Sequence, residues 1–197
     1  LNIYSPITYA LGCAAGGFLF GMRTSKHPKT AHITAPIYVA FQGAFIACTG
    51  VIVEVWWPGI ILVTVGLTLT TFFALLAVYA TKLIKPTENT KLGIAAATGG
   101  LLIMYIIEAL LPMSGLTESG SFLLKATPFG IGMSLFGCGV AAFNLVLDFD
   151  FIEQGVEQGT NPKHMEWIGA FGLIVTLVWL YFELLHLLAL LAIEDDD

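Results

Sequence analysis

The sequence predicts an all-α membrane protein in which a bundle of helices crosses the bilayer several times. Hydrophobic residues make up 57% of the chain and charged residues only 11%, whereas soluble domains carry about 25% charged residues. The mean hydropathy is +0.85. The apolar residues form continuous runs and do not alternate with polar ones, which favours membrane helices over the strands of a barrel.

Six apolar segments are long enough to cross a membrane, for which about 20 mainly apolar residues are needed. The first is rich in small residues, which let helices approach closely in lipid. The second and third are separated by the turn Trp56-Trp57-Pro58-Gly59, and the last begins just after Asn161-Pro162, a pair typical of a helix start. The predicted spans of this single membrane domain, residues 1–197, are 4–22, 35–55, 58–81, 92–111, 128–150 and 167–193.

The basic residues predict the orientation of these spans. Seven of the eight fall in loops that share one side of the membrane: Arg23, Lys26, Lys29, Lys82, Lys85, Lys91 and Lys163. Only Lys125 falls on the other side. Because basic loops remain in the cytoplasm, we expect loops 23–34, 82–91 and 149–166 to be cytoplasmic and the C-terminus to lie outside.

The composition and the missing motifs exclude several classes of function. Eight basic residues provide no stripe for nucleic acid. Nucleotide-binding and HExxH patterns are missing, and the three cysteines have no metal-binding spacing. The sequence shows no nucleophile with a matching base, so we expect neither an enzyme nor a cofactor.

Acidic residues inside the spans are the best candidates for function, because a charge at membrane depth is costly. Glu183 lies in the run VTLVWLYFELLHLLALL, so its side chain must face the bundle interior or a wet cavity. His186, three residues later, lies on the same face and can share a proton or a hydrogen bond with it. We expect a polar functional cluster here, with a purely structural pair as the alternative.

Asp148 and Asp150 in the run FNLVLDFDFIEQG differ in their helix phase by about 200°. Asn144 shares the face of Asp148, which is therefore the candidate interior acid. Asp150 shares its face with Glu153, Gln154 and Glu157, and this face is typical of a solvated stripe beyond a span.

Two further acids lie near the predicted outer ends of spans. Glu54 precedes the Trp-Trp-Pro-Gly turn, and Glu108 lies about one turn inside the fourth span. For each of them the sequence leaves two interpretations open: the acid lies at a solvated helix end, or it belongs to an ion pathway.

The runs FNLVLDFDFIEQGVEQG, PKHMEW and TLVWLYFELLHLL, together with APIYVAFQG and WWPGIILV, resemble the Bax inhibitor-1/YccA family of membrane proteins, in its bacterial branch. The resemblance covers residues 35–191. It implies seven helices with the last one central, and since the chain does not begin with Met, we expect a first helix that is missing from this sequence. Gln42 stands where the resemblance implies Glu in many bacterial members, which removes one charge that could interact with an ion.

The resemblance also implies a pH-dependent Ca²⁺ leak, in which two acids on the last two helices share a proton. Asp148 and Glu183 match these acids by position, although Glu183 is one methylene longer than the usual Asp. Two carboxylates in a site of low dielectric constant cannot both ionise cheaply, and their oxygens suit Ca²⁺. Helix geometry opposes the pairing. Asp148 lies near the cytoplasmic end of its helix, whereas Glu183 lies ~24 Å along the last helix from Trp167, which is near the cytoplasmic start of that helix.

The leading hypothesis is therefore a pH-sensitive Ca²⁺ leak channel or ion-flux regulator of the bacterial inner membrane. The alternative is a non-conducting membrane partner that regulates or stabilises another membrane complex or a protease. The small residues of segment 12–17 suit helix docking of that kind. In both cases the lipid bilayer surrounds the protein and no nucleic acid is involved.

Overall fold

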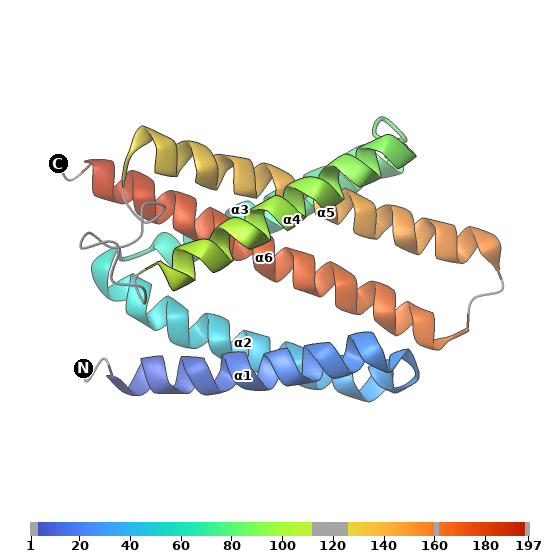
Figure 1. The fold of residues 1–197 in the computed structure, drawn as a ribbon, viewed down its shortest axis with the longest axis horizontal. Helices are drawn as coiled ribbons and strands as arrows, with labels where there is room; N and C mark the ends of the chain where they lie inside the picture. Colours follow the sequence, from blue (N-terminus) through green and yellow to red (C-terminus); the bar gives the residue numbers. More distant parts are fainter. Residues whose placement is uncertain (1–3, 112–125, 160–161, 196–197) are drawn as a thin grey trace. The chain divides into compact units, whose positions relative to one another are not determined.

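The computed structural model describes residues 4–111, 126–159 and 162–195, and every regular element in these ranges is helical. In chain order the elements are α1 (Tyr4–Lys26), η1 (Pro28–Thr30), α2 (Ala31–Trp56), α3 (Ile60–Ala80), α4 (Glu88–Leu110), α5 (Pro128–Gln158) and α6 (His164–Asp195) (Figure 1). The all-α prediction is confirmed.

Five stretches of the described chain are long and apolar enough to cross a membrane. They are Pro28–Trp56, Ile60–Ala80, Glu88–Leu110, Pro128–Gln158 and His164–Ile193. Each corresponds to one of the predicted spans. Helix α1 occupies the position of the remaining one, 4–22, which stays a prediction.

The helices extend beyond the apolar runs from which the spans were predicted. Helix α5 continues eight residues past position 150 and ends at Gln158. The next residue, Gly159, has a φ of +62°, which is the left-handed conformation common just after helix ends. Helix α4 begins at Glu88 because Thr87 caps it by accepting a hydrogen bond from the Thr90 amide. The segments expected as loops at 23–34 and 149–166 are therefore mostly helical. Hydrophobicity marks where a helix meets lipid, whereas capping residues mark where the helix stops.

The chain forms two compact units. The first comprises residues 1–61 and 148–178, and the second comprises residues 62–147 and 179–197. The first therefore contains α1, α2, the C-terminal part of α5 and the N-terminal part of α6. The second contains nearly all of α3, together with α4 and the remaining parts of α5 and α6.

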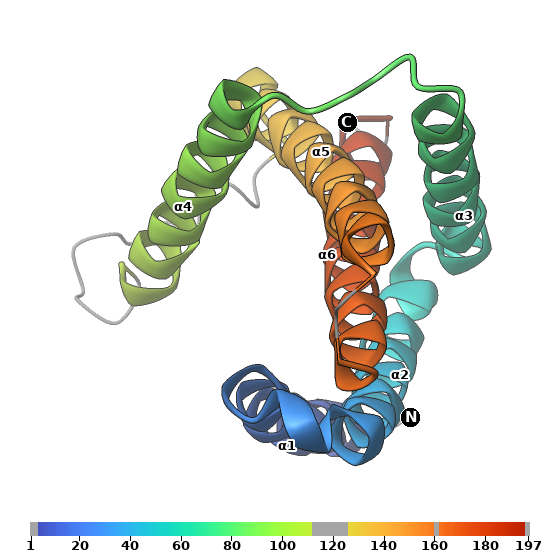
Figure 2. The ribbon, with the colours of Figure 1, turned by 90° about the vertical axis from the view of Figure 1, so that its right-hand side faces the viewer.

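In the first unit, α1 and α2 lie side by side (Figures 1 and 2). Glycine makes this contact possible, because a Cβ atom at Gly16 would lie only 2.5 Å from the ring of Phe41. A hydrogen bond of 2.7 Å between the buried hydroxyls of Thr24 and Thr34 joins the helices near their connection. Part of the small-residue segment that suited docking to a partner is thus already used within the chain.

Helix α6 joins the first unit through its N-terminal part. The ring of Phe171 packs edge-on against Tyr38 of α2, with 5.0 Å between the ring centroids. In the second unit, the core includes three leucines that are almost fully buried: Leu145 of α5 and Leu180 and Leu190 of α6. Figure 2 shows the connection between α3 and α4 as an extended segment.

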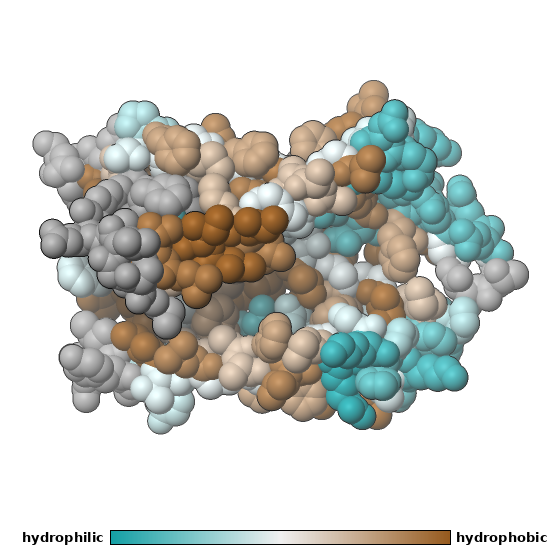
Figure 3. Space-filling view, viewed as in Figure 1, coloured by the Kyte–Doolittle hydropathy of each residue, from teal (hydrophilic) through white to brown (hydrophobic). Residues whose placement is uncertain are grey.

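Large apolar side chains are exposed along the helices, as a lipid environment requires. Helix α4 exposes Leu102, Ile103, Ile106, Ile107 and Leu110, which form a brown patch in Figure 3. Hydrophilic side chains gather instead where α1 leads into α2 (Figure 3). The chain is an integral membrane protein of several helices.

Replacing Gly16 by Ala should lower the stability of the protein, by about 1–3 kcal/mol, because the new methyl group overpacks the contact with Phe41. The ring of Phe41 has little room to move, since it also stacks on Phe20. Gly12→Ala, in the same helix, is the matched control: a Cβ there meets nothing within 4 Å. It should leave stability unchanged or raise it by up to about 1 kcal/mol. Thermal unfolding in detergent measures both, and equal effects would contradict this packing.

Candidate functional site

The most buried acid in the described chain is Glu183, whose side chain is 5% exposed in the middle of α6. One carboxylate oxygen, Oε1, accepts two hydrogen bonds. The Tyr105 hydroxyl of α4 donates one over 2.6 Å, and the Trp179 indole N–H, one turn earlier on α6, donates the other over 2.7 Å. All three residues belong to the second unit.

Helix α5 makes room for this carboxylate with a glycine. A Cβ atom at Gly137 would lie 2.9 Å from the Glu183 carboxyl carbon and 3.2 Å from the Tyr105 hydroxyl. The Ser134 hydroxyl, one turn earlier on α5, donates a long hydrogen bond of 3.5 Å to the backbone carbonyl of Glu183. Three helices of the second unit therefore meet at this one acid.

A cavity of about 520 Å³ lies beside the carboxylate. It is lined by Thr98, Leu102, Tyr105, Trp179, Phe182, Glu183 and His186. The Nε2 atom of His186 is buried and has no hydrogen-bond partner among the described residues. His186 and Glu183 thus share the cavity, while the hydrogen bonds of the carboxylate go to Tyr105 and Trp179.

Asn144 belongs to the same unit as Glu183. Its amide donates to the Thr98 hydroxyl over 2.8 Å and to the Val140 carbonyl over 2.9 Å. Because Thr98 lines the cavity, Asn144 joins α5 to the α4 wall of the site. Helix phase grouped Asn144 with Asp148, but the partners of Asn144 in the structure belong to the second unit.

Asp148 of α5 lies in the first unit and is half-buried. Its carboxyl group lies beside the side chain of Thr176, whose hydroxyl donates to the Gly172 carbonyl over 3.2 Å, and a Cβ atom at Gly172 would lie 3.4 Å from the Asp148 Oδ1. Its Oδ2 is buried without a hydrogen-bond partner in the described part of the chain. Because Asp148 and Glu183 belong to different units, the sharing of a proton between them stays a prediction.

The remaining candidates have local roles. Gln154 donates to Asp150 over 2.6 Å on an exposed face of α5. Glu54 caps the start of α3 by accepting hydrogen bonds from the amides of Gly59 (2.6 Å) and Ile61 (3.4 Å).

Gln42 and Glu108 lie on α2 and α4. Gln42 faces Gly17 of α1, and Glu108 is half-buried on α4. No group of three or more His, Cys, Asp and Glu among the described residues is arranged to hold a metal. Bound Ca²⁺ at Asp148 and Glu183 therefore stays a prediction.

Sequence reasoning missed the residues that hold Glu183. Trp179 could have been found, because it lies four residues before Glu183 and helical residues at that spacing are neighbours. Tyr105 and Gly137 lie on other helices, and nothing in a single sequence connects them to Glu183.

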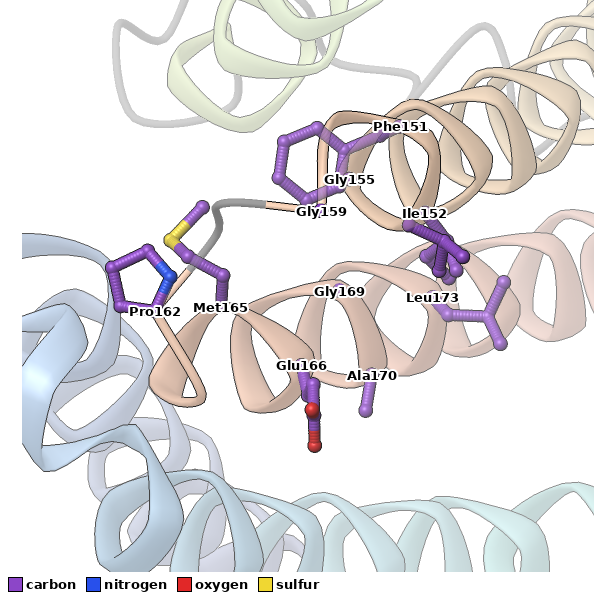
Figure 4. A pocket seen from close by; sticks show the side chains of 11 residues that line it. Phe151, Ile152, Gly155, Gly159, Pro162, Met165, Glu166, Gly169, Ala170 and Leu173 are labelled. Carbon is purple, nitrogen blue, oxygen red and sulfur yellow. The ribbon is translucent and has the colours of Figure 1, made fainter.

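A second cavity, of about 430 Å³, lies within the first unit where α5 meets α6 (Figure 4). It is lined by Phe151, Ile152, Gly155, Val156, Gly159, Pro162, Met165, Glu166, Gly169, Ala170 and Leu173. Glycines let the helices meet closely here, since a Cβ at Gly169 would lie 3.0 Å from Ile152. The lining has one charged residue, Glu166, which points away from α5 in Figure 4.

These features define a polytopic helical membrane protein with a buried acid in one of its spans. Residues 2–193 match the family described as Bax inhibitor 1 like, and the chain belongs to this family. The family resemblance drawn from the sequence motifs is therefore confirmed, while the bacterial branch stays a prediction. No match was found among curated proteins or among solved structures.

Gly137→Ala should destabilise the protein by about 1–3 kcal/mol, because the added methyl group displaces the Glu183 carboxylate from its two donors. Gly139→Ala, two residues later on α5, is the control, since a Cβ there meets nothing within 4 Å. Thermal unfolding of both variants in detergent checks this. A Gly137→Ala protein as stable as the control would show that the carboxylate does not need this approach.

Proposed function

We propose that this chain is a pH-sensitive cation leak channel of the bacterial inner membrane that passes Ca²⁺, with Glu183 as its central protonatable group. The observation that carries the proposal is the burial of this carboxylate, at 5% exposure, within a membrane-spanning helix. Membership of the family supports it, because a Ca²⁺ leak is the activity that the resemblance implies.

The surroundings of Glu183 favour a role for its charge. It forms no salt bridge with any described Lys or Arg, and the side chains that donate hydrogen bonds to it, Tyr105 and Trp179, are neutral. An ionised acid without a counter-charge is costly in a site of low dielectric constant. Binding a proton removes that cost, and so does a cation close by. Proton binding and cation passage would therefore compete for the same group.

Asp148 is the second acid of the proposal. Its Oδ2 atom is buried without a hydrogen-bond partner among the described residues, so a proton or a cation at this atom would offset the cost of its burial. The resemblance implies that the two acids act together. We assign supporting roles to His186 and Asn144, because the first lines the Glu183 cavity and the second binds its wall.

The test is Ca²⁺ entry into liposomes that contain the purified protein, measured with an enclosed dye at a series of pH values from about pH 5 to 8, the range around physiological pH. The native protein should conduct with a clear dependence on pH. Glu183→Gln and Asp148→Asn should each flatten that dependence, because the amides cannot exchange a proton. Glu157→Gln is the matched control: it removes an exposed acid of α5 and should behave like the native protein.

Equal flux at every pH in all four proteins would contradict the proposal. Flux no greater than in empty liposomes would also contradict it, and would favour the non-conducting membrane partner. If Glu157→Gln flattened the pH dependence as well, the effect would come from surface charge and not from the buried acids.

A further inference from the structure

We infer that the cavity beside Glu183 is a binding site for a lipophilic organic ammonium ion. The cavity combines one buried carboxylate with three aromatic side chains, Tyr105, Trp179 and Phe182. Aromatic rings together with a negative charge are the groups that recognise ammonium ligands in water-poor sites. The negative charge and the rings belong to the same unit, so the site is complete within it.

The contents of the cavity favour an organic cation over a resident metal ion. Ca²⁺ takes six to eight oxygen ligands, whereas the lining supplies one carboxylate and the hydroxyls of Thr98 and Tyr105. The rest of the lining is largely apolar. A metal ion would lose its hydration shell there without replacing it, while an alkylammonium ion carries its own apolar surface.

A polar atom in the cavity also lacks a partner. The buried Nε2 atom of His186 makes no hydrogen bond to any described residue, and a neutral imidazole nitrogen can accept one from an ammonium N–H. Glu183 and His186 thus offer two polar contacts to a primary ammonium group. Tyr105, Trp179, Phe182 and Leu102 are left to contact its apolar part.

The cavity can be reached from the bilayer. Leu102, one of the lining residues, is 59% exposed on α4, which is one of the apolar helices long enough to cross a membrane. An amphiphilic amine dissolved in the membrane would enter by this side, with its apolar part remaining among apolar groups. The size of the cavity, about 520 Å³, is in the range of sites for small organic ligands.

Binding of phenylbutylammonium to the protein in lipid nanodiscs tests the inference. Phenylbutanol, which has the same skeleton without the charge, is the control ligand. Trp179 serves as the reporter after W56F, W57F and W167F remove the other three tryptophans. The ammonium ion should change the Trp179 fluorescence saturably and bind at least about tenfold more tightly than the alcohol. E183Q should remove that preference, whereas E88Q, which changes an exposed acid of α4, should keep it.

Equal affinity for the ammonium ion and the alcohol would overturn the inference, as would an undiminished preference in folded E183Q. If E183Q does not fold, F182L replaces it: this variant keeps an apolar side chain but removes a ring, and should bind the ammonium ion several-fold more weakly. Unchanged binding by F182L would then overturn the inference. The site uses the same carboxylate as the proposed channel, but the assay contains no ion gradient, so absence of Ca²⁺ flux and absence of binding are separate results.

Discussion

Burial of one carboxylate at membrane depth is the constraint around which the second unit is built. Glu183 cannot face lipid, so the neighbouring helices must supply what water would otherwise supply. Tyr105 and Trp179 provide the donors, and Gly137 provides the space. The donors and the space are both needed, because a side chain at position 137 would push the Glu183 carboxylate away from Tyr105 and Trp179. The packing of these three helices and the hydrogen bonding of Glu183 therefore depend on each other.

The sequence predicted the architecture more completely than the site. Continuous apolar runs located the helices because a bilayer demands length and hydrophobicity, and both can be read from one chain. Helix ends were less accurate, since Thr87 and Gly159 set them through capping and backbone conformation and not through hydrophobicity. Within the site, Glu183 and His186 were found because they interrupt an apolar run. Tyr105 was not, since its contact crosses 78 residues of sequence.

The two acids of α5 and α6 differ in their surroundings. Glu183 has two strong donors and an aromatic cavity, whereas Asp148 has Thr176 and one buried oxygen without a partner in the described chain. Donated hydrogen bonds replace part of the solvation that a carboxylate loses on burial, and the two acids differ in how much of it is replaced. The two acids therefore lie in different surroundings, although the family resemblance implies that they act as a pair.

Glu54 shows how an acid near the end of one helix can cap the start of the next. Its carboxylate accepts hydrogen bonds from the amides of Gly59 and Ile61, across the short turn that follows α2. The first amides of a helix have no partner within that helix, and a membrane offers them none. With this cap in place, the first amides of α3 have a partner that lies only five to seven residues away along the chain. Segment 54–61 therefore supplies the cap of α3 from its own sequence, and the start of α3 needs no helix other than α2 for these two hydrogen bonds.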